Sequence, residues 1–135
     1  MEDIRTIPRK YRNNKVIAME LVKIDGLAIK DIPSELAGDY DLVLNALSSN
    51  PLALKYTIDS IEQILYSGNY NDEQIIKLYS VICDCVRSDG MLLQYLCEEL
   101  REDNLIVNTA ITNNPDALQF ASPKFLLNKK KFIKL

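Results

Sequence analysis

The sequence has no histidine and no tryptophan, and it has only four glycines, five prolines and three cysteines. The lack of histidine excludes Ser-His and Cys-His nucleophile activation and most types of zinc site. The low glycine and proline content argues against a turn-rich all-β fold and against a disordered linker. No apolar run approaches the ~18 residues of a transmembrane helix, so we expect no membrane span.

The cysteines and the first residues bear on the compartment. Cys83, Cys85 and Cys97 are an odd number in apolar surroundings, which favours buried thiols over a disulfide framework. The opening stretch, MEDIRTIPRKYR, is charged and lacks the apolar region of a signal peptide. Both features predict a cytoplasmic or otherwise reducing compartment, and secretion as an effector without a signal peptide stays open.

Charge is distributed unevenly along the chain. Residues 24–116 carry five basic and sixteen acidic side chains, whereas residues 117–135 carry five basic side chains and no acidic one. An acidic middle repels nucleic acid, so we expect a protein partner rather than a nucleic-acid partner. Residues 1–23 are also basic overall, with six basic and three acidic side chains. Contact between the basic ends of one molecule and the acidic middle of another would be a form of self-association.

Four dipeptides recur in phase: Asp25-Gly26, Asn50-Pro51, Asp89-Gly90 and Asn114-Pro115. Successive second residues are separated by 25, 39 and 25 residues. Apolar residues occupy the same offsets before and after each dipeptide, with the i, i+3, i+4 spacing of a helix face. Leu54 and Leu118 hold one such offset, three residues after their prolines, and we expect both in the core.

The residues between these dipeptides predict how each repeat is built. Asn14, Asp39 and Asp103 stand where an N-cap would begin a first helix, and the Asp or Asn of each dipeptide would cap a second, shorter helix. The longer middle spacing predicts an insertion between Ile58 and Asp72. Asn128 would cap the start of a fifth first helix.

The predicted fold class is all-α: a short α-solenoid of stacked helical hairpins, with about four ~25-residue repeat units, one of them with an insertion. The units of this single domain, residues 1–135, are approximately 14–38, 39–66, 72–102 and 103–127, with half-units at both ends.

The stretches DYDLVLNALSSNPLALKY, EDNLIVNTAITNNPDALQFAS and VIAMELVKIDGLAIKDIPSEL share this pattern. It resembles a tandem helical repeat family catalogued as domain of unknown function 4116, whose copies occur in bacterial and giant-virus proteins. The resemblance implies stacked short helices and use in protein interaction, in some cases within secreted effectors. It brings no catalytic residues to this chain.

No residue pattern predicts a catalytic, cofactor-binding or metal-binding site, so we expect no enzyme and no cofactor. The leading hypothesis is a protein-interaction module, a scaffold or adaptor; the alternative is a structural or self-assembling unit of a larger array. Polar positions of the first helices would form the partner-binding face: Asn45, Ser48, Ser49, Asp84, Arg87, Ser88, Thr109, Thr112 and Asn113. Tyr66 and Tyr70, in the insertion, are the candidate exposed aromatic anchors of an interface.

Overall fold

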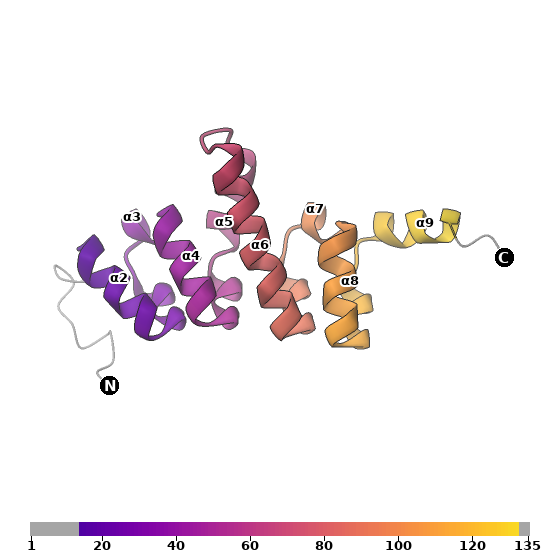
Figure 1. Cartoon of the computed structure of the whole chain (residues 1–135), viewed down its shortest axis with the longest axis horizontal. Helices are drawn as coiled ribbons and strands as arrows, with labels where there is room; N and C mark the ends of the chain where they lie inside the picture. The colour runs from indigo at the N-terminus through magenta and orange to yellow at the C-terminus, as the bar shows by residue number, and fades with distance from the viewer. Residues whose placement is uncertain (1–13, 133–135) are drawn as a thin grey trace.

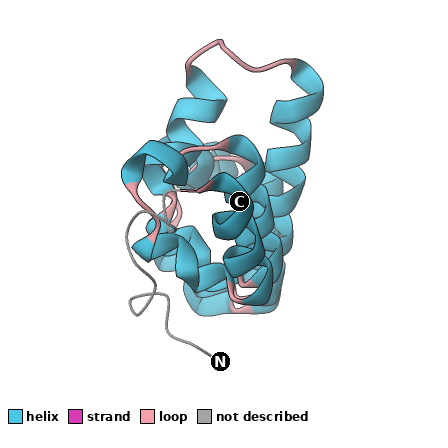
Figure 2. Cartoon of the chain, turned by 90° about the vertical axis from the view of Figure 1, so that its left-hand side faces the viewer, coloured by secondary structure: helices cyan, strands magenta, loops and turns pink. Residues whose placement is uncertain are grey.

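The structure, a computed structural model, describes the backbone of residues 14–132 and the side chains of residues 14–127. This part of the chain is all-helical, without a strand (Figures 1 and 2). In chain order the elements are α2 (Lys15–Ile24), η2 (Gly26–Asp31), α3 (Ser34–Ala37), α4 (Tyr40–Ser49), η3 (Pro51–Tyr56), α5 (Ile58–Tyr66), α6 (Asp72–Ser88), η4 (Gly90–Tyr95), α7 (Glu98–Arg101), α8 (Asn104–Asn113), η5 (Pro115–Phe120) and α9 (Pro123–Phe132), where η denotes a 3-10 helix.

The helices are arranged in two rows. The α-helices α2, α4, α6 and α8 pack side by side in the order in which they occur in the chain, and the 3-10 helices η2, η3, η4 and η5 pack in the same order (Figure 1). The hairpin of α5 and α6 projects above the rest of the molecule, which Figure 2 shows end-on. We call the junction between a first-row helix and its 3-10 helix a corner. The four recurring dipeptides lie at the four corners.

The N-caps occur where the sequence predicts them. The side chain of Asn14 accepts a hydrogen bond from the backbone N–H of Val16 at 2.9 Å. Asp39 and Asp103 cap α4 and α8 by accepting hydrogen bonds from the N–H groups of Leu42 and Ile106. Each side chain takes up a backbone donor that has no partner inside its own helix. The prediction of these helix starts is therefore confirmed.

The predicted helix ends on either side of the turn at Gly68 are also confirmed. The helix α5 ends at Tyr66, the chain turns at Gly68, whose φ is 79°, and α6 begins at Asp72. Asn71 caps α6 in a capping box: Asn71 Oδ1 accepts from the Gln74 N–H, and Gln74 Oε1 accepts from the Asn71 N–H. With 17 residues, α6 is the longest helix in the described part of the chain.

The prediction of two helices per unit is wrong, because each corner is followed by two short elements. At every corner the capping side chain accepts a hydrogen bond from the N–H two residues on, as Asp25 does from Leu27 at 3.0 Å. The turn continues as a six-residue 3-10 helix, and a separate α-helix of 4 to 10 residues follows. After η2 and η5 the two elements are separated by Pro33 and Pro123, because proline cannot continue the hydrogen bonding of a preceding helix.

The core runs between the two rows, and the repeated apolar positions fill it. Leu54 is fully buried, as predicted, since α6 and η4 pack against its side of η3. The matching prediction for Leu118 is wrong, because this side chain is 46% exposed. In the described part of the chain no further pair of helices packs beyond α8 and η5. Burial at this offset therefore depends on the next pair of helices as well as on the local sequence.

The prediction that Asn128 begins a new helix is also wrong. The helix α9 runs from Pro123 to Phe132 and continues through position 128 without a break. It extends past α8 on the side away from α6 (Figure 1). The matching half-unit at the start of the chain, predicted from Ile7-Pro8, lies outside the described residues.

Candidate interaction groove

Two corners carry glycine because a neighbouring backbone lies against them. A Cβ at Gly26 would stand 2.1 Å from the carbonyl oxygen of Ala46, and one at Gly90 would stand 2.2 Å from that of Ala110. No side chain fits in this space. Each glycine corner is therefore in direct backbone contact with the first-row helix that follows it.

A polar side chain of the next helix closes each glycine corner. The Gly26 N–H donates to Ser49 Oγ at 3.0 Å, and the Gly90 N–H donates to Asn113 Oδ1 at 2.8 Å. Asn113 Nδ2 also donates to the backbone carbonyl of Arg87 at 3.0 Å. We call Ser49 and Asn113 the corner clamps. The sequence predicts both as partner-binding residues, whereas in the structure they hold neighbouring units together.

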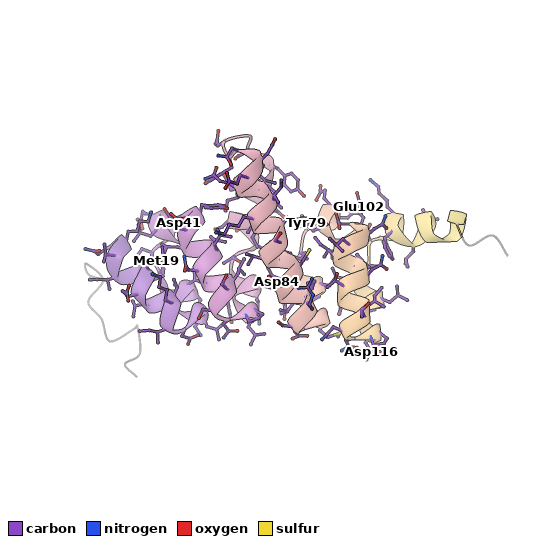
Figure 3. All side chains as sticks on the ribbon, viewed as in Figure 1. Met19, Asp41, Tyr79, Asp84, Glu102 and Asp116 are labelled. Atoms are coloured by element: carbon purple, nitrogen blue, oxygen red, sulfur yellow. The ribbon has the colours of Figure 1, made fainter. Side chains whose placement is uncertain are left out.

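The same pairs of helices are tied at their other end through an N-cap aspartate. Lys15 Nζ lies 3.1 Å from Asp39 Oδ2, which joins α2 to the start of α4. Tyr79, labelled in Figure 3 on the side of α6 that faces α8, donates through its hydroxyl to Asp103 Oδ1 at 2.5 Å. Burial, together with this hydrogen bond and the charge of Asp103, raises the pKa of Tyr79.

The helices thus associate as two pairs. The first pair is α2 with α4 and the second is α6 with α8, and both pack more closely than α4 does against α6. The junction between the pairs has a proline corner at Pro51, which has no N–H to donate. There the hydroxyl of Tyr40 donates to the Gln74 carbonyl at 2.8 Å, and Cys85 Sγ lies 3.8 Å from the Leu47 carbonyl oxygen.

A groove lies between the two helices of the second pair. It has a volume of about 450 Å³, and its lining consists of one residue of α6 and four of α8: Arg87, Asn108, Thr109, Thr112 and Asn113. Four of these five belong to the predicted partner-binding face. Arg87 pairs with Asp84, which Figure 3 labels on α6, and both side chains are largely exposed. The groove therefore presents amide and hydroxyl groups with one charged pair at its edge.

Asn108 is the lining residue that the sequence prediction missed. Its position corresponds to Leu44 and Cys83 in the two preceding first-row helices, where the side chains are 7% and 5% exposed. When the sequence is aligned on the four dipeptides, Asn108 is a polar residue at a position that is otherwise apolar. The alignment could therefore have identified it as a candidate site residue. In the structure Asn108 is exposed, and its carbonyl accepts a hydrogen bond from Thr112 Oγ1 at 2.8 Å.

The other predicted face residues do not line the groove. Ser48 and Ser88 are exposed at the ends of α4 and α6. Asn45 is half-buried, and its side-chain amide donates to the Asp41 carbonyl of its own helix at 2.8 Å. The predicted strip is thus divided between a groove on α6 and α8, separate exposed residues, and the two corner clamps.

The two predicted aromatic anchors differ in exposure. Tyr66 is 55% exposed and lines a second hollow, of about 610 Å³, together with Asp59, Glu62, Gln63 and Ser67. Tyr70 is half-buried, contrary to the exposed side chain that the sequence predicts. Its ring stacks on Tyr40 at a centroid distance of 5.8 Å, which holds the tip of the α5–α6 hairpin against α4.

The cysteines are poor nucleophiles in these surroundings. Burial raises the pKa of the Cys85 thiol to about 12, and burial also raises the pKa values of Cys83 and Cys97. All three therefore favour the neutral thiol at neutral pH. Within the described residues, no group of three or more cysteine, aspartate or glutamate side chains could hold a metal ion.

These features define an all-α protein in which short helices pack in chain order and are held by specific corner contacts. The chain belongs to the family described as a domain of unknown function, DUF4116, which matches it over residues 7–61 and 80–126. Each matched segment contains one glycine corner followed by one proline corner. No curated protein and no solved structure matches the chain. None of the helices in residues 14–132 is both long and apolar enough to cross a membrane.

Proposed function

We propose that the chain is a short α-solenoid that acts as a protein-interaction module without enzymatic activity. The observation that carries this proposal is the groove between α6 and α8, which is lined by Arg87, Thr109 and Thr112 of the predicted face and by the corner clamp Asn113. Stacked helical repeats with a constant core and variable polar positions commonly present such extended binding surfaces.

The chemistry of the groove favours a protein segment as its occupant. Asn108, Thr109 and Thr112 offer hydrogen-bond donors and acceptors of the kind that pair with a polypeptide backbone. Arg87 at the edge offers a guanidinium to a carboxylate of the partner, in exchange for its exposed ion pair with Asp84. The excess of acidic side chains in residues 24–116 disfavours a nucleic-acid partner.

Two matched variants test the groove. Thr112→Arg fills it, and Ser48→Arg makes the same change in charge at the corresponding place near the end of α4, outside the groove. Both side chains are exposed, so both variants are expected to fold. Partner capture from a cell lysate, followed by mass spectrometry, should retain the same protein on the unmodified chain and on Ser48→Arg.

Capture of that protein should fall at least about tenfold on Thr112→Arg, which corresponds to a loss of about 1.4 kcal/mol of binding free energy. Equal capture by the two variants would place the binding surface elsewhere. If the unmodified chain retains no specific protein, the groove is solvated surface and the proposed function is wrong.

A further inference from the structure

The far side of α8 and η5 exposes apolar groups that are covered at the preceding proline corner. Leu118 is 46% exposed, Pro115 is exposed and Ile111 is half-buried. The residues at the positions of Ile111 and Leu118 in the preceding unit are Leu47 and Leu54, which are 1% and 0% exposed. There α6 and η4 supply the cover. We call the surface of Ile111, Pro115 and Leu118 the trailing face.

The opposite side of the molecule exposes apolar groups at the positions that supply such cover. Leu21 and Ala28 are half-buried, and Ile24 is 60% exposed. In α6 and η4, Cys85 and Leu92 hold the positions of Leu21 and Ala28, and each is 2% exposed. We call the surface of Leu21, Ile24 and Ala28 the leading face. The leading face lies on α2 and η2. Its position on these two helices corresponds to that of the α6 and η4 surface that packs on the Pro51 corner.

The two kinds of corner select different neighbours. At both glycine corners the helix that packs on the corner brings alanine into contact with the glycine, Ala46 or Ala110, and a polar clamp three residues later. At Pro51 the position of those alanines is held by the larger Cys85, and the proline has no N–H for a clamp to accept. The second position at this junction is held by Ser88, which is exposed and clamps no N–H. A larger residue at the first position and no clamp at the second therefore characterise the neighbour of a proline corner.

The leading face has the characteristics of such a neighbour. Leu21 takes the position of Ala46, Ala110 and Cys85, and Ile24 takes the position of the clamps Ser49 and Asn113. Ile24 has no polar group with which to accept the N–H of a glycine corner, but it can pack on a proline ring. The trailing face is built around Pro115, so it fits the leading face in both size and polarity.

We propose that the trailing face of one molecule binds the leading face of a second copy of this chain, in a head-to-tail contact that continues the row of helices. The contact is heterologous, because the two molecules use different surfaces. Such a contact builds a ring or an open filament rather than a closed two-fold dimer. This inference is independent of the groove, since the two faces share no residue with it.

The test uses two exposed substitutions that each block one face. Leu118→Glu disables the trailing face, Ile24→Glu disables the leading face, and Ile76→Glu is the control. Ile76 is 64% exposed near the start of α6, between the two segments that the family matches and outside both faces. Sedimentation velocity across a range of concentrations gives the mass of each chain alone and of mixtures, and circular dichroism checks that each variant is helical.

The unmodified chain and Ile76→Glu should associate with rising concentration, and each blocked variant alone should require at least about tenfold more protein to do so. An equimolar mixture of Leu118→Glu and Ile24→Glu keeps one intact pair of faces and should form dimers and nothing larger. A monomeric unmodified chain would overturn the proposal. So would a mixture that stays monomeric, or a single blocked variant that associates like the unmodified chain.

Discussion

The glycine corner at Gly90 and the proline corner at Pro51 follow α6 and α4 in the same way, yet they contact the neighbouring helix differently. At Gly90 the backbones of neighbouring units touch, and Asn113 bonds to the free N–H. At Pro51 no N–H is available to a clamp, and α4 and α6 pack less closely than α6 and α8 do. In this structure the glycine corners therefore lie within closely packed pairs of helices, and the Pro51 corner lies at the less closely packed junction between the pairs.

The largest effect should come from adding a methyl group at a glycine corner. Gly90→Ala places a Cβ against the Ala110 carbonyl, and backbone cannot move aside as a side-chain end can. We expect a loss above about 3 kcal/mol in the free energy of unfolding, beyond the usual range for overpacking. Urea denaturation of Gly90→Ala and of the unmodified chain measures this difference in the free energy of unfolding. Gly38→Ala is the control, because its Cβ would meet only Ser60 Oγ at 3.8 Å and should leave stability nearly unchanged.

The next effect compares the two proline corners with each other. Leu54→Ala opens a cavity under η3 and should lower the free energy of unfolding by about 3 kcal/mol. Leu118→Ala makes the same change on the exposed trailing face and should cost about 1 kcal/mol or less. Both values come from denaturation at a concentration where the chain is monomeric. Equal losses would mean that the trailing face is covered in the monomer.

A smaller effect should follow removal of a corner clamp. Asn113→Ala leaves the part-buried Gly90 N–H without its acceptor, which should cost about 1–2 kcal/mol. Ser88→Ala changes the equivalent residue at the proline corner, where there is no N–H to lose, and should stay within about 0.5 kcal/mol of the unmodified chain. The difference in the free energy of unfolding between these two variants measures how much the clamp hydrogen bond stabilises the fold. A difference near zero would show that the clamp contributes no stability.

The smallest effect should come from exchanging one kind of corner for the other. Pro51→Gly keeps the Asn50 cap and adds no atoms, so the folded state can accommodate it. The glycine gives the unfolded chain more freedom, and we expect a loss of about 0.5–1 kcal/mol. A loss as large as that of Gly90→Ala would contradict the distinction between the corners.

Local chemistry made much of the fold predictable. Asn14, Asp39 and Asp103 begin helices because a cap needs only its own following turn, and the insertion ends at Asp72 for the same reason. The exposure of Leu118 could not be predicted in this way, since a repeat alignment gives it the same environment as Leu54. The division of the second helix into a 3-10 helix and a short α-helix depends on hydrogen bonds that the apolar period does not specify.

The candidate site was predictable only in part. Arg87, Thr109 and Thr112 line the groove because an exposed face recurs with the helical period. Ser49 and Asn113 have the same polarity and period, yet their partners, Gly26 and Gly90, are 23 residues away in sequence. A pattern of polar positions does not separate residues that face a partner from residues that hold a neighbouring unit.

The α5–α6 hairpin has a practical consequence. Its turn at Gly68 is exposed, a Cβ there would meet nothing within 4 Å, and it lies apart from the groove and both end faces. A fluorophore or short tag inserted between Gly68 and Asn69 would therefore report on partner binding and on head-to-tail contact without touching either surface. The turn offers one attachment point from which both proposals can be followed in the same molecule.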